Sequence, residues 1–282
     1  MADRFVSLDG SPLAPGRSPV RIRVREFGSG DALMFLHGGW GYAIYPFDGE
    51  IARLERSYRI LVPDRTGYGQ SESIDRQLPD FHGRAAAESL SVLDVLGVDR
   101  AVLWGHSDGA VIALRMALTA PHRVAAVIAE ATHFFRRKPG SRTFFETMRD
   151  APDSLGSRVA AVLEQEHGAR WRSLIKTNGA AWLQIADEAR SPAADLYDGQ
   201  LPHIRVPTLV VHGSKDPRTE PGELDALASA LGHAPRLEFA VSEPAGHSPH
   251  SERDSADAVT NAALGFLSNA TCGLYRPSDA RR

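Results

Sequence analysis

A serine between two glycines, where one apolar segment ends and another begins, constrains this chain more than any other feature. Residues 103–110 read Leu-Trp-Gly-His-Ser-Asp-Gly-Ala, which places Ser107 in the spacing Gly-x-Ser-x-Gly. The apolar run before it, residues 99–104, is typical of a buried parallel strand. The alanine-rich run after it, residues 110–118, is long enough for a buried helix. A serine in so sharp a turn is held in a strained backbone conformation. We therefore expect the Ser107 hydroxyl to project out of a sheet, beside a helix N-terminus that favours negative charge.

Strand-like and helix-like segments alternate along most of the chain. Residues 1–19 are a loose lead-in or a short first strand, and residues 20–27 alternate apolar and charged side chains, as an edge strand with one wet face does. Further strands are predicted at residues 32–36, 58–63, 124–129, 204–213 and 236–241, and helices at residues 47–56, 85–96, 220–230 and 254–267. This order predicts a doubly wound, mostly parallel sheet.

The alternation stops at His133. From there to about residue 202 the sequence is charged and mainly helical, with helical runs at residues 157–165 and 171–190. We interpret this segment as an inserted helical cap. The predicted organisation is a core of residues 1–132 and 204–270, a cap of residues 133–203, and a C-terminal tail of residues 271–282.

Composition argues against several classes of partner. The chain has 32 Lys and Arg against 35 Asp and Glu, a net charge of -3, which gives no reason to expect binding to nucleic acid or to an anionic membrane. The single cysteine, Cys272, cannot form an internal disulfide, and no Cys/His cluster has the spacing of zinc ligands. The first residues do not read as a signal peptide, and no apolar run is long enough to span a membrane. We expect a cytoplasmic protein that acts on a small molecule without a metal or cofactor; its oligomeric state is left open.

Two later turns carry the groups that a serine nucleophile needs. The predicted strand 204–213 leads into Ser-Lys-Asp-Pro, which puts Asp216 at the carboxyl edge of the sheet, where functional groups of such sheets gather. The loop after the last strand contains His247 and His250. Because a serine hydroxyl is a poor nucleophile at neutral pH, it requires an adjacent base. We predict His247 as that base, with His250 as its rival, and Asp216 as the carboxylate that orients the ring.

Other residues near these turns are interpreted as structural, or their role is left open. The turn His-Gly-Gly-Trp-Gly at residues 37–41 either leaves backbone N–H groups free for a ligand or is a tight turn that needs glycine. Asp64 and Arg65 are interpreted as bonding the local backbone. His106 is expected to pack away from the nucleophile.

With the chain order Ser107, Asp216, His247, these motifs resemble the α/β-hydrolase fold family from about Val20 to Leu267. The resemblance implies an α/β-hydrolase fold with an inserted helical cap and hydrolysis of a small carboxylic ester through an acyl-enzyme. It also implies an oxyanion hole formed by the backbone N–H groups of Asp108 and Gly39, with Trp40 as second choice. An amide, thioester or carbon–carbon bond stays open as the bond cleaved, as does a ligand receptor that keeps the triad.

The residue after the serine is Asp108, whereas many members of the family carry a neutral residue at that position. A Ser-Asp-Gly turn with a helical cap resembles the valacyclovir hydrolase (biphenyl hydrolase-like) group, which implies that Asp108 binds the ammonium of an amino-acyl ester. The alternative is that Asp108 caps the helix or pairs with a cap arginine. Substrate-lining aromatic residues are expected at Trp40, Phe134 and Trp182, and Arg136, Arg137 and Lys138 either meet an anionic group or form a solvated face.

Overall fold

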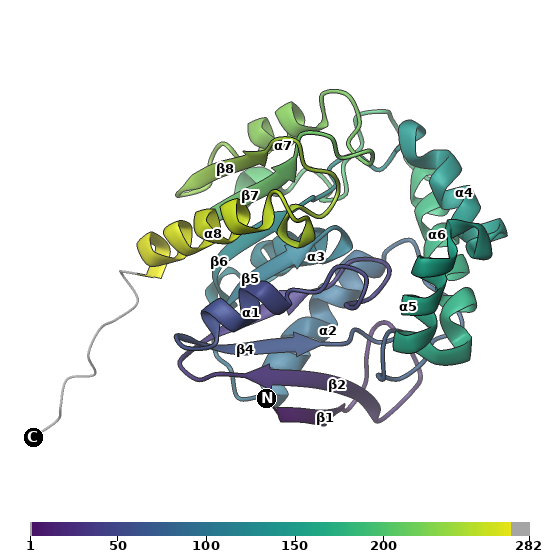
Figure 1. The fold of residues 1–282 in the computed structure, drawn as a ribbon, viewed down its shortest axis with the longest axis horizontal. Coiled ribbons are helices and arrows are strands. Elements are labelled where there is room, and N and C mark those ends of the chain that lie inside the picture. Colours follow the sequence, from purple (N-terminus) through teal and green to yellow (C-terminus); the bar gives the residue numbers. More distant parts are fainter. Residues whose placement is uncertain (1, 272–282) are drawn as a thin grey trace, which may run out of the picture.

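An eight-stranded sheet runs through the computed structural model, which describes residues 2–271 (Figure 1). The strands lie in the order β1-β2-β4-β3-β5-β6-β7-β8. Their bounds are β1 Ala2–Leu8, β2 Val20–Phe27, β3 Asp31–Leu36, β4 Tyr58–Pro63, β5 Ala101–His106, β6 Val124–Glu130, β7 Thr208–Gly213 and β8 Leu237–Ser242. Only β2 runs against its neighbours, so the predicted mostly parallel sheet is confirmed.

The predicted edge position of residues 20–27 is wrong. β2 pairs on both sides, with β1 and with β4, and the short first strand β1 takes the edge. In β2 the apolar side chains Val20, Ile22 and Val24 are buried, while Arg21 is exposed. The alternating pattern therefore reports one wet face of the sheet, a property that an interior strand can share with an edge strand.

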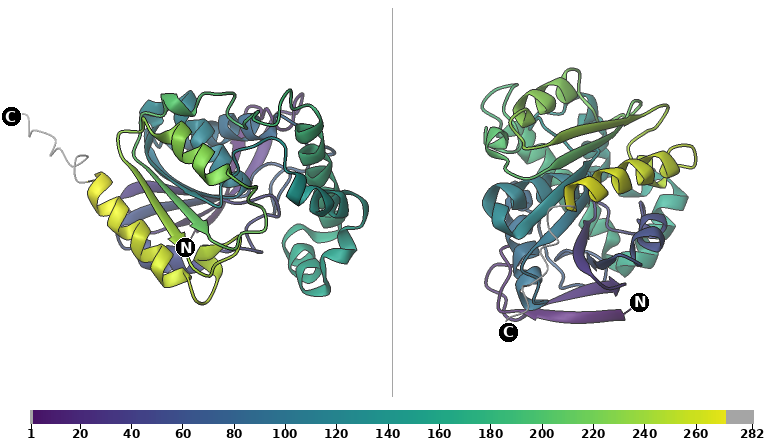
Figure 2. Two further views of the ribbon diagram at one scale, coloured as in Figure 1. Left: turned by 90° about the horizontal axis from the view of Figure 1, so that it is seen from above. Right: turned by 90° about the vertical axis from the view of Figure 1, so that its left-hand side faces the viewer.

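Helices cover both faces of the sheet, and Figure 2 shows α1 and α8 on the same side of it. α1 (Asp48–Leu54) and α8 (Ala256–Thr271) pack against strand side chains that include Phe35 and Trp104. α2 (Phe81–Val95), α3 (Asp108–Thr119) and α7 (Glu223–Leu231) cover the opposite face, on side chains that include Met34 and Leu103. Since successive side chains of a strand point to opposite faces, each buried strand supplies both cores. The fully apolar runs of β3 and β5 follow from this arrangement.

Three helices lie between β6 and β7, beside the carboxyl ends of the parallel strands (Figure 1). They are α4 (Arg142–Asp150), α5 (Ser157–His167) and α6 (Trp171–Asp187), and α4 packs against α6. Their place is the segment that the sequence assigns to a cap. None of the helices within residues 2–271 has the length and apolarity needed to cross a membrane. Of the predicted tail, Thr271 ends α8, and Cys272 lies outside the described residues.

Candidate active site

Ser107 occupies the tight turn between β5 and α3. Its φ of 56° and ψ of -120° are a strained conformation for a residue other than glycine. The turn is possible because its neighbours have no side chain: a Cβ on Gly105 would lie 2.1 Å from the Gly109 carbonyl oxygen, and one on Gly109 would lie 1.9 Å from that of Leu36. The strain holds the Ser107 hydroxyl out of the sheet and next to the start of α3.

The structure brings His247 and Asp216 to Ser107. His247 Nε2 lies 3.1 Å from Ser107 Oγ, and its Nδ1 lies 3.0 and 2.9 Å from the two Asp216 carboxylate oxygens. Burial alone would raise the pKa of Asp216, but the hydrogen bond and charge of His247 bring it down to about 2. Asp216 is therefore ionised at neutral pH, and it fixes the proton on His247 Nδ1. That tautomer leaves Nε2 free to accept the Ser107 proton.

The rival histidine has no nitrogen left for Ser107. His250 Nδ1 lies 2.8 Å from the Glu130 carboxylate, and its Nε2 lies 3.2 Å from the Tyr45 carbonyl oxygen. The geometry therefore excludes His250 as the base. His106 supports the loop of His247 instead: its Nε2 lies 2.9 Å from the His247 carbonyl oxygen, and burial lowers its pKa to about 3, which keeps the ring neutral.

A second histidine touches the serine, and sequence reasoning missed it. His133 Nε2 lies 3.3 Å from Ser107 Oγ, and its ring stacks at 5.7 Å between centroids on that of His247. Burial holds the pKa of His133 well below its usual value, so the ring is neutral. Because the Ser107 proton is directed at His247, His133 meets the hydroxyl oxygen as an N–H donor. Its position in the sequence could have indicated this role, because His133 follows β6 at the carboxyl edge of the sheet.

Backbone N–H groups face the same space. Asp108 is the first residue of α3, and within residues 2–271 no protein acceptor takes its N–H or that of Gly39. Gly39, Trp40 and Asp108 all line one cavity with Ser107, His133 and His247. The predicted oxyanion donors are thus beside the serine, at a helix N-terminus, where such donors stabilise developing negative charge.

Helix α5 holds the loop that carries Gly39 and Trp40. The Glu166 carboxylate accepts the backbone N–H groups of Tyr42 and Ala43 at 2.7 and 3.0 Å. His167 Nδ1 accepts the Gly69 N–H, so its Nε2 donates to the Trp40 carbonyl oxygen at 3.0 Å. Burial raises the pKa of Glu166 to about 7. The inserted helices therefore take part in placing the predicted oxyanion hole.

The cavity at Ser107 is small, about 50 Å³, and its roof comes from α4 and α6. The remaining lining side chains include Tyr45, Phe144, Phe145, Met148, Asn178, Trp182 and Arg218. A larger cavity of about 850 Å³ lies farther along α4 and α6, and of the lining residues it shares only Phe145 with the first. Ser107 lines the smaller cavity and is not among the residues that line the larger one.

The Asp108 side chain is buried and already bonded. One carboxylate oxygen lies 3.1 Å from both His82 Nε2 and Trp182 Nε1, and the other lies 3.3 Å from Asn178 Nδ2. Burial opposes its ionisation, but the hydrogen bond and charge of His82 lower the pKa of Asp108 below its usual value. Among residues 2–271, the Asp108 side chain is bonded to no arginine, and it does not cap α3. It ties the core to α6, which corrects the expected cap or arginine contact.

Of the aromatic residues expected at the substrate, Trp40 and Trp182 line the cavity and Phe134 does not. The Phe134 ring is buried against Phe135 and Tyr197. That prediction is corrected, because the chain turns after His133 and carries the next side chain away from Ser107. The three basic residues after it also point elsewhere: Arg136 pairs with Asp198, Arg137 donates to the Ala189 carbonyl oxygen, and Lys138 pairs with Glu223.

Two further residues expected to be structural make local contacts. The Asp64 carboxylate pairs with Arg25 at 2.6 Å and accepts the Gln70 N–H, and the Arg65 side chain donates to the His37 carbonyl oxygen. As for metals, residues 2–271 contain no group of three or more His, Cys, Asp or Glu side chains arranged to hold an ion.

Comparison with known proteins places this geometry in a family. The sequence model described as "Alpha/beta hydrolase family" matches residues 33–262. A 2-hydroxy-6-oxo-6-phenylhexa-2,4-dienoate hydrolase of Burkholderia cepacia is 27% identical, over 90% of this chain and 93% of its own. Serine hydrolase BPHL of Mus musculus is 28% identical, over 70% of this chain and 68% of its own. The fold matches a thermophilic esterase of Thermogutta terrifontis with a TM-score of 0.70 at 21% identity, over 95% of this chain and 99% of that one.

Proposed function

The chain belongs to the alpha/beta hydrolase family, and we propose that it is a serine hydrolase that cleaves a small carboxylic ester through an acyl-enzyme. The observation that carries the proposal is the unbroken contact from Asp216 to His247 to Ser107, with distances of 2.9 and 3.1 Å. Such contacts match the roles of orienting carboxylate, general base and nucleophile.

In the proposed reaction, His247 Nε2 takes the Ser107 proton while Oγ attacks the ester carbonyl carbon. The negative charge on the resulting tetrahedral intermediate is held by the N–H of Asp108 and that of Gly39 or Trp40. Loss of one such donor typically costs about 3 kcal/mol of transition-state stabilisation. His247 then gives the proton to the leaving alcohol, and a water molecule hydrolyses the acyl-enzyme by the same two steps.

We also propose that residues 133–203 act as a cap over this site. Phe144 and Phe145 from α4, and Asn178 and Trp182 from α6, line the cavity at Ser107, which supports this role. In this position the inserted helices limit which substrates reach the serine. The boundaries of the cap remain those that the sequence predicts.

An amino-acyl ester is a narrower version of the proposal, in which Asp108 would bind the substrate ammonium. The resemblance of the Ser-Asp-Gly turn to that of the valacyclovir hydrolase group is the reason to consider it. The three donors already around the Asp108 carboxylate weigh against it, because an ammonium would have to share or displace them. The dienoate hydrolase relative is a reason to test carbon–carbon bond cleavage beside ester hydrolysis.

The test is hydrolysis of p-nitrophenyl esters with neutral, anionic and α-amino acyl groups, together with 2-hydroxy-6-oxo-6-phenylhexa-2,4-dienoate, by the wild type and Ser107→Ala. We expect multiple turnovers of esters by the wild type and none above background by Ser107→Ala. A preference for the α-amino ester that Asp108→Asn removes would support the narrower version. Turnover of the dienoate alone would replace the ester proposal, and binding without turnover would favour a receptor.

A further inference from the structure

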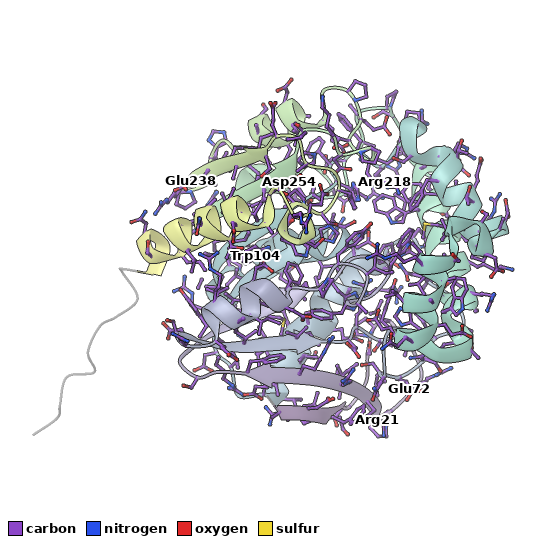
Figure 3. The ribbon with its side chains drawn as sticks, viewed as in Figure 1. Arg21, Glu72, Trp104, Arg218, Glu238 and Asp254 are labelled. Carbon is purple, nitrogen blue, oxygen red and sulfur yellow. The ribbon has the colours of Figure 1, made fainter. Side chains whose placement is uncertain are left out.

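Among residues 2–271, Arg218 is the one lysine or arginine that lines the cavity at Ser107. It lies two positions after Asp216, in the loop that follows β7, and Figure 3 labels it between the core and the helices α4 and α6. The side chain is largely buried, and its guanidinium carbon lies 3.0 Å above the centroid of the Phe144 ring. The cation is therefore held at the substrate space.

This guanidinium has no direct carboxylate partner within residues 2–271, although the charge of Asp216 acts on it. In that part of the chain, no side-chain hydrogen bond or ion pair joins Arg218 to an acidic residue, whereas Arg25 and Arg115, for example, each have one. Asp216 is already engaged: its carboxylate accepts the Arg218 backbone N–H, and both of its oxygens lie within hydrogen-bond distance of His247 Nδ1. A largely buried cation without an anion costs free energy, unless a ligand supplies the partner.

The other ionisable groups of the cavity do not supply or compete for that partner. Asp108 is the other charged side chain at the cavity, and its carboxylate already accepts hydrogen bonds from His82, Asn178 and Trp182 inside the protein. His106 and His133 are neutral because burial lowers the pKa of each ring. Of the two charged side chains, Arg218 is the one whose charged group has no side-chain hydrogen-bond partner among residues 2–271, and its charge is positive.

We propose that Arg218 binds an anionic group of the substrate, most simply a carboxylate, so that the enzyme prefers esters that carry a negative charge near the scissile bond. The planar guanidinium suits a carboxylate, because its N–H groups match the two oxygens in paired hydrogen bonds. The inference rests on the proposed esterase function and deepens it, and it runs against an ammonium-bearing substrate.

The carboxylate could belong to the acyl group or to the leaving group, and two matched ester pairs distinguish them. One pair is p-nitrophenyl hemiglutarate and p-nitrophenyl pentanoate, which differ in charge on the acyl side. The other is the butyrate of 3-carboxy-4-nitrophenol and that of 4-nitrophenol, which differ on the leaving-group side. For each pair the ratio of kcat/KM, anionic over neutral, is measured in the wild type, Arg218→Met, Arg218→Lys and Arg137→Met.

We expect one pair to show a ratio above 1 in the wild type that falls about 10- to 100-fold in Arg218→Met, since hydrogen bonds to charged groups are worth roughly that factor. Arg218→Lys should recover part of the ratio, because it keeps the charge but loses the planar fork. Arg137→Met is the matched control, since Arg137 donates to Ala189 outside this cavity and should leave the ratio unchanged. An unchanged ratio in a folded Arg218→Met overturns the inference and leaves the esterase proposal standing.

A second measurement does not depend on turnover. In Ser107→Ala, calorimetry gives the affinity for the members of each pair with and without Arg218→Met. Tighter binding of one anionic ester that is lost with Arg218 supports the inference even if no ester is hydrolysed, in which case only the esterase proposal fails. If Arg218→Met lowers Tm and weakens both members equally, Arg218 only joins the loop to Phe144 of α4, and the inference is wrong.

Discussion

Two histidines three positions apart after β8, His247 and His250, each pair with a carboxylate, and only one of these pairs is arranged for chemistry. Asp216 and His247 meet at 2.9 Å, and the far nitrogen of His247 reaches Ser107. Glu130 and His250 meet at 2.8 Å, but the far nitrogen of His250 reaches the Tyr45 carbonyl oxygen. The His247 side chain is 14% exposed, whereas both side chains of the second pair are fully buried.

The comparison shows that a paired histidine is not by itself a catalytic base. Both acids are held ionised: despite burial, the paired histidines lower the pKa of Asp216 and that of Glu130 to about 2. The difference lies in what each far nitrogen meets and in access to the cavity. The Glu130 carboxylate also accepts the Trp104 indole N–H, and the Glu130 backbone carbonyl accepts the Ser107 N–H. The second pair therefore stabilises the turn that carries Ser107.

The largest expected contrast is between the two histidines. His247→Gln should slow labelling of Ser107 by a fluorophosphonate about 10⁴-fold or more, because no base remains for the hydroxyl. His250→Asn, which keeps a donor near the Nδ1 position, should label within about tenfold of the wild type while it lowers the free energy of unfolding. Labelling rates and urea unfolding of both variants measure this. If folded His250→Asn is as slow as His247→Gln, the distinction between the two pairs fails.

We expect replacement of Asp216 to affect mainly the labelling of Ser107, and replacement of Glu130 to affect mainly stability. Asp216→Asn removes the carboxylate that fixes the His247 tautomer, so we expect labelling to fall by about 10⁴-fold with little loss of stability. Glu130→Gln leaves the buried His250 without its anion and should cost about 3 kcal/mol of unfolding free energy in urea, with a much smaller effect on labelling. A stable Glu130→Gln that no longer labels would instead assign Glu130 to the chemistry.

A third acid–histidine contact, of 3.5 Å between Glu166 and His167, differs from both pairs because burial raises the pKa of this acid. Its folded-state pKa of about 7 exceeds the ordinary 4.5, so between these values the native state binds more protons than the unfolded state. The contribution of Glu166 is therefore most favourable below about pH 4.5 and is lost as pH rises through 7. The unfolding free energy of Glu166→Gln minus that of the wild type should rise between pH 5 and 8, on the order of 3 kcal/mol. A difference that stays flat across this range contradicts the assignment.

The smallest expected effect concerns His133, which forms no pair with an acidic side chain among residues 2–271. As a neutral N–H donor to Ser107 Oγ, it should be replaceable in part by Gln, whose amide N–H reaches a similar position, but not by Phe. We expect His133→Phe to slow labelling about tenfold and His133→Gln to recover most of that loss, since one hydrogen bond is worth roughly this factor. Equal rates in Phe, Gln and wild type would leave His133 with a packing role.

The sequence predicted the sheet, the turn at Ser107 and the meeting of Ser107, Asp216 and His247 because local spacing determines each of them. The sequence could not show that His133 and Arg218 lie beside Ser107, since this depends on the direction in which a side chain points after its strand has ended. Phe134 shows the same limit: it neighbours His133 in the chain, but its ring packs on Phe135 and Tyr197 and does not line the cavity at Ser107. The β1 edge was uncertain because residues 2–8 mix exposed polar and buried apolar side chains.

The most direct test of the account is the site and stoichiometry of fluorophosphonate labelling on the intact chain. The labelled wild type is digested, and mass spectrometry locates the adduct, with Ser107→Ala as the control. We predict one adduct per chain, on Ser107, and none in Ser107→Ala. A folded wild type that does not label, or an adduct that persists in Ser107→Ala, would contradict the claim that His247 and Asp216 make Ser107 a nucleophile.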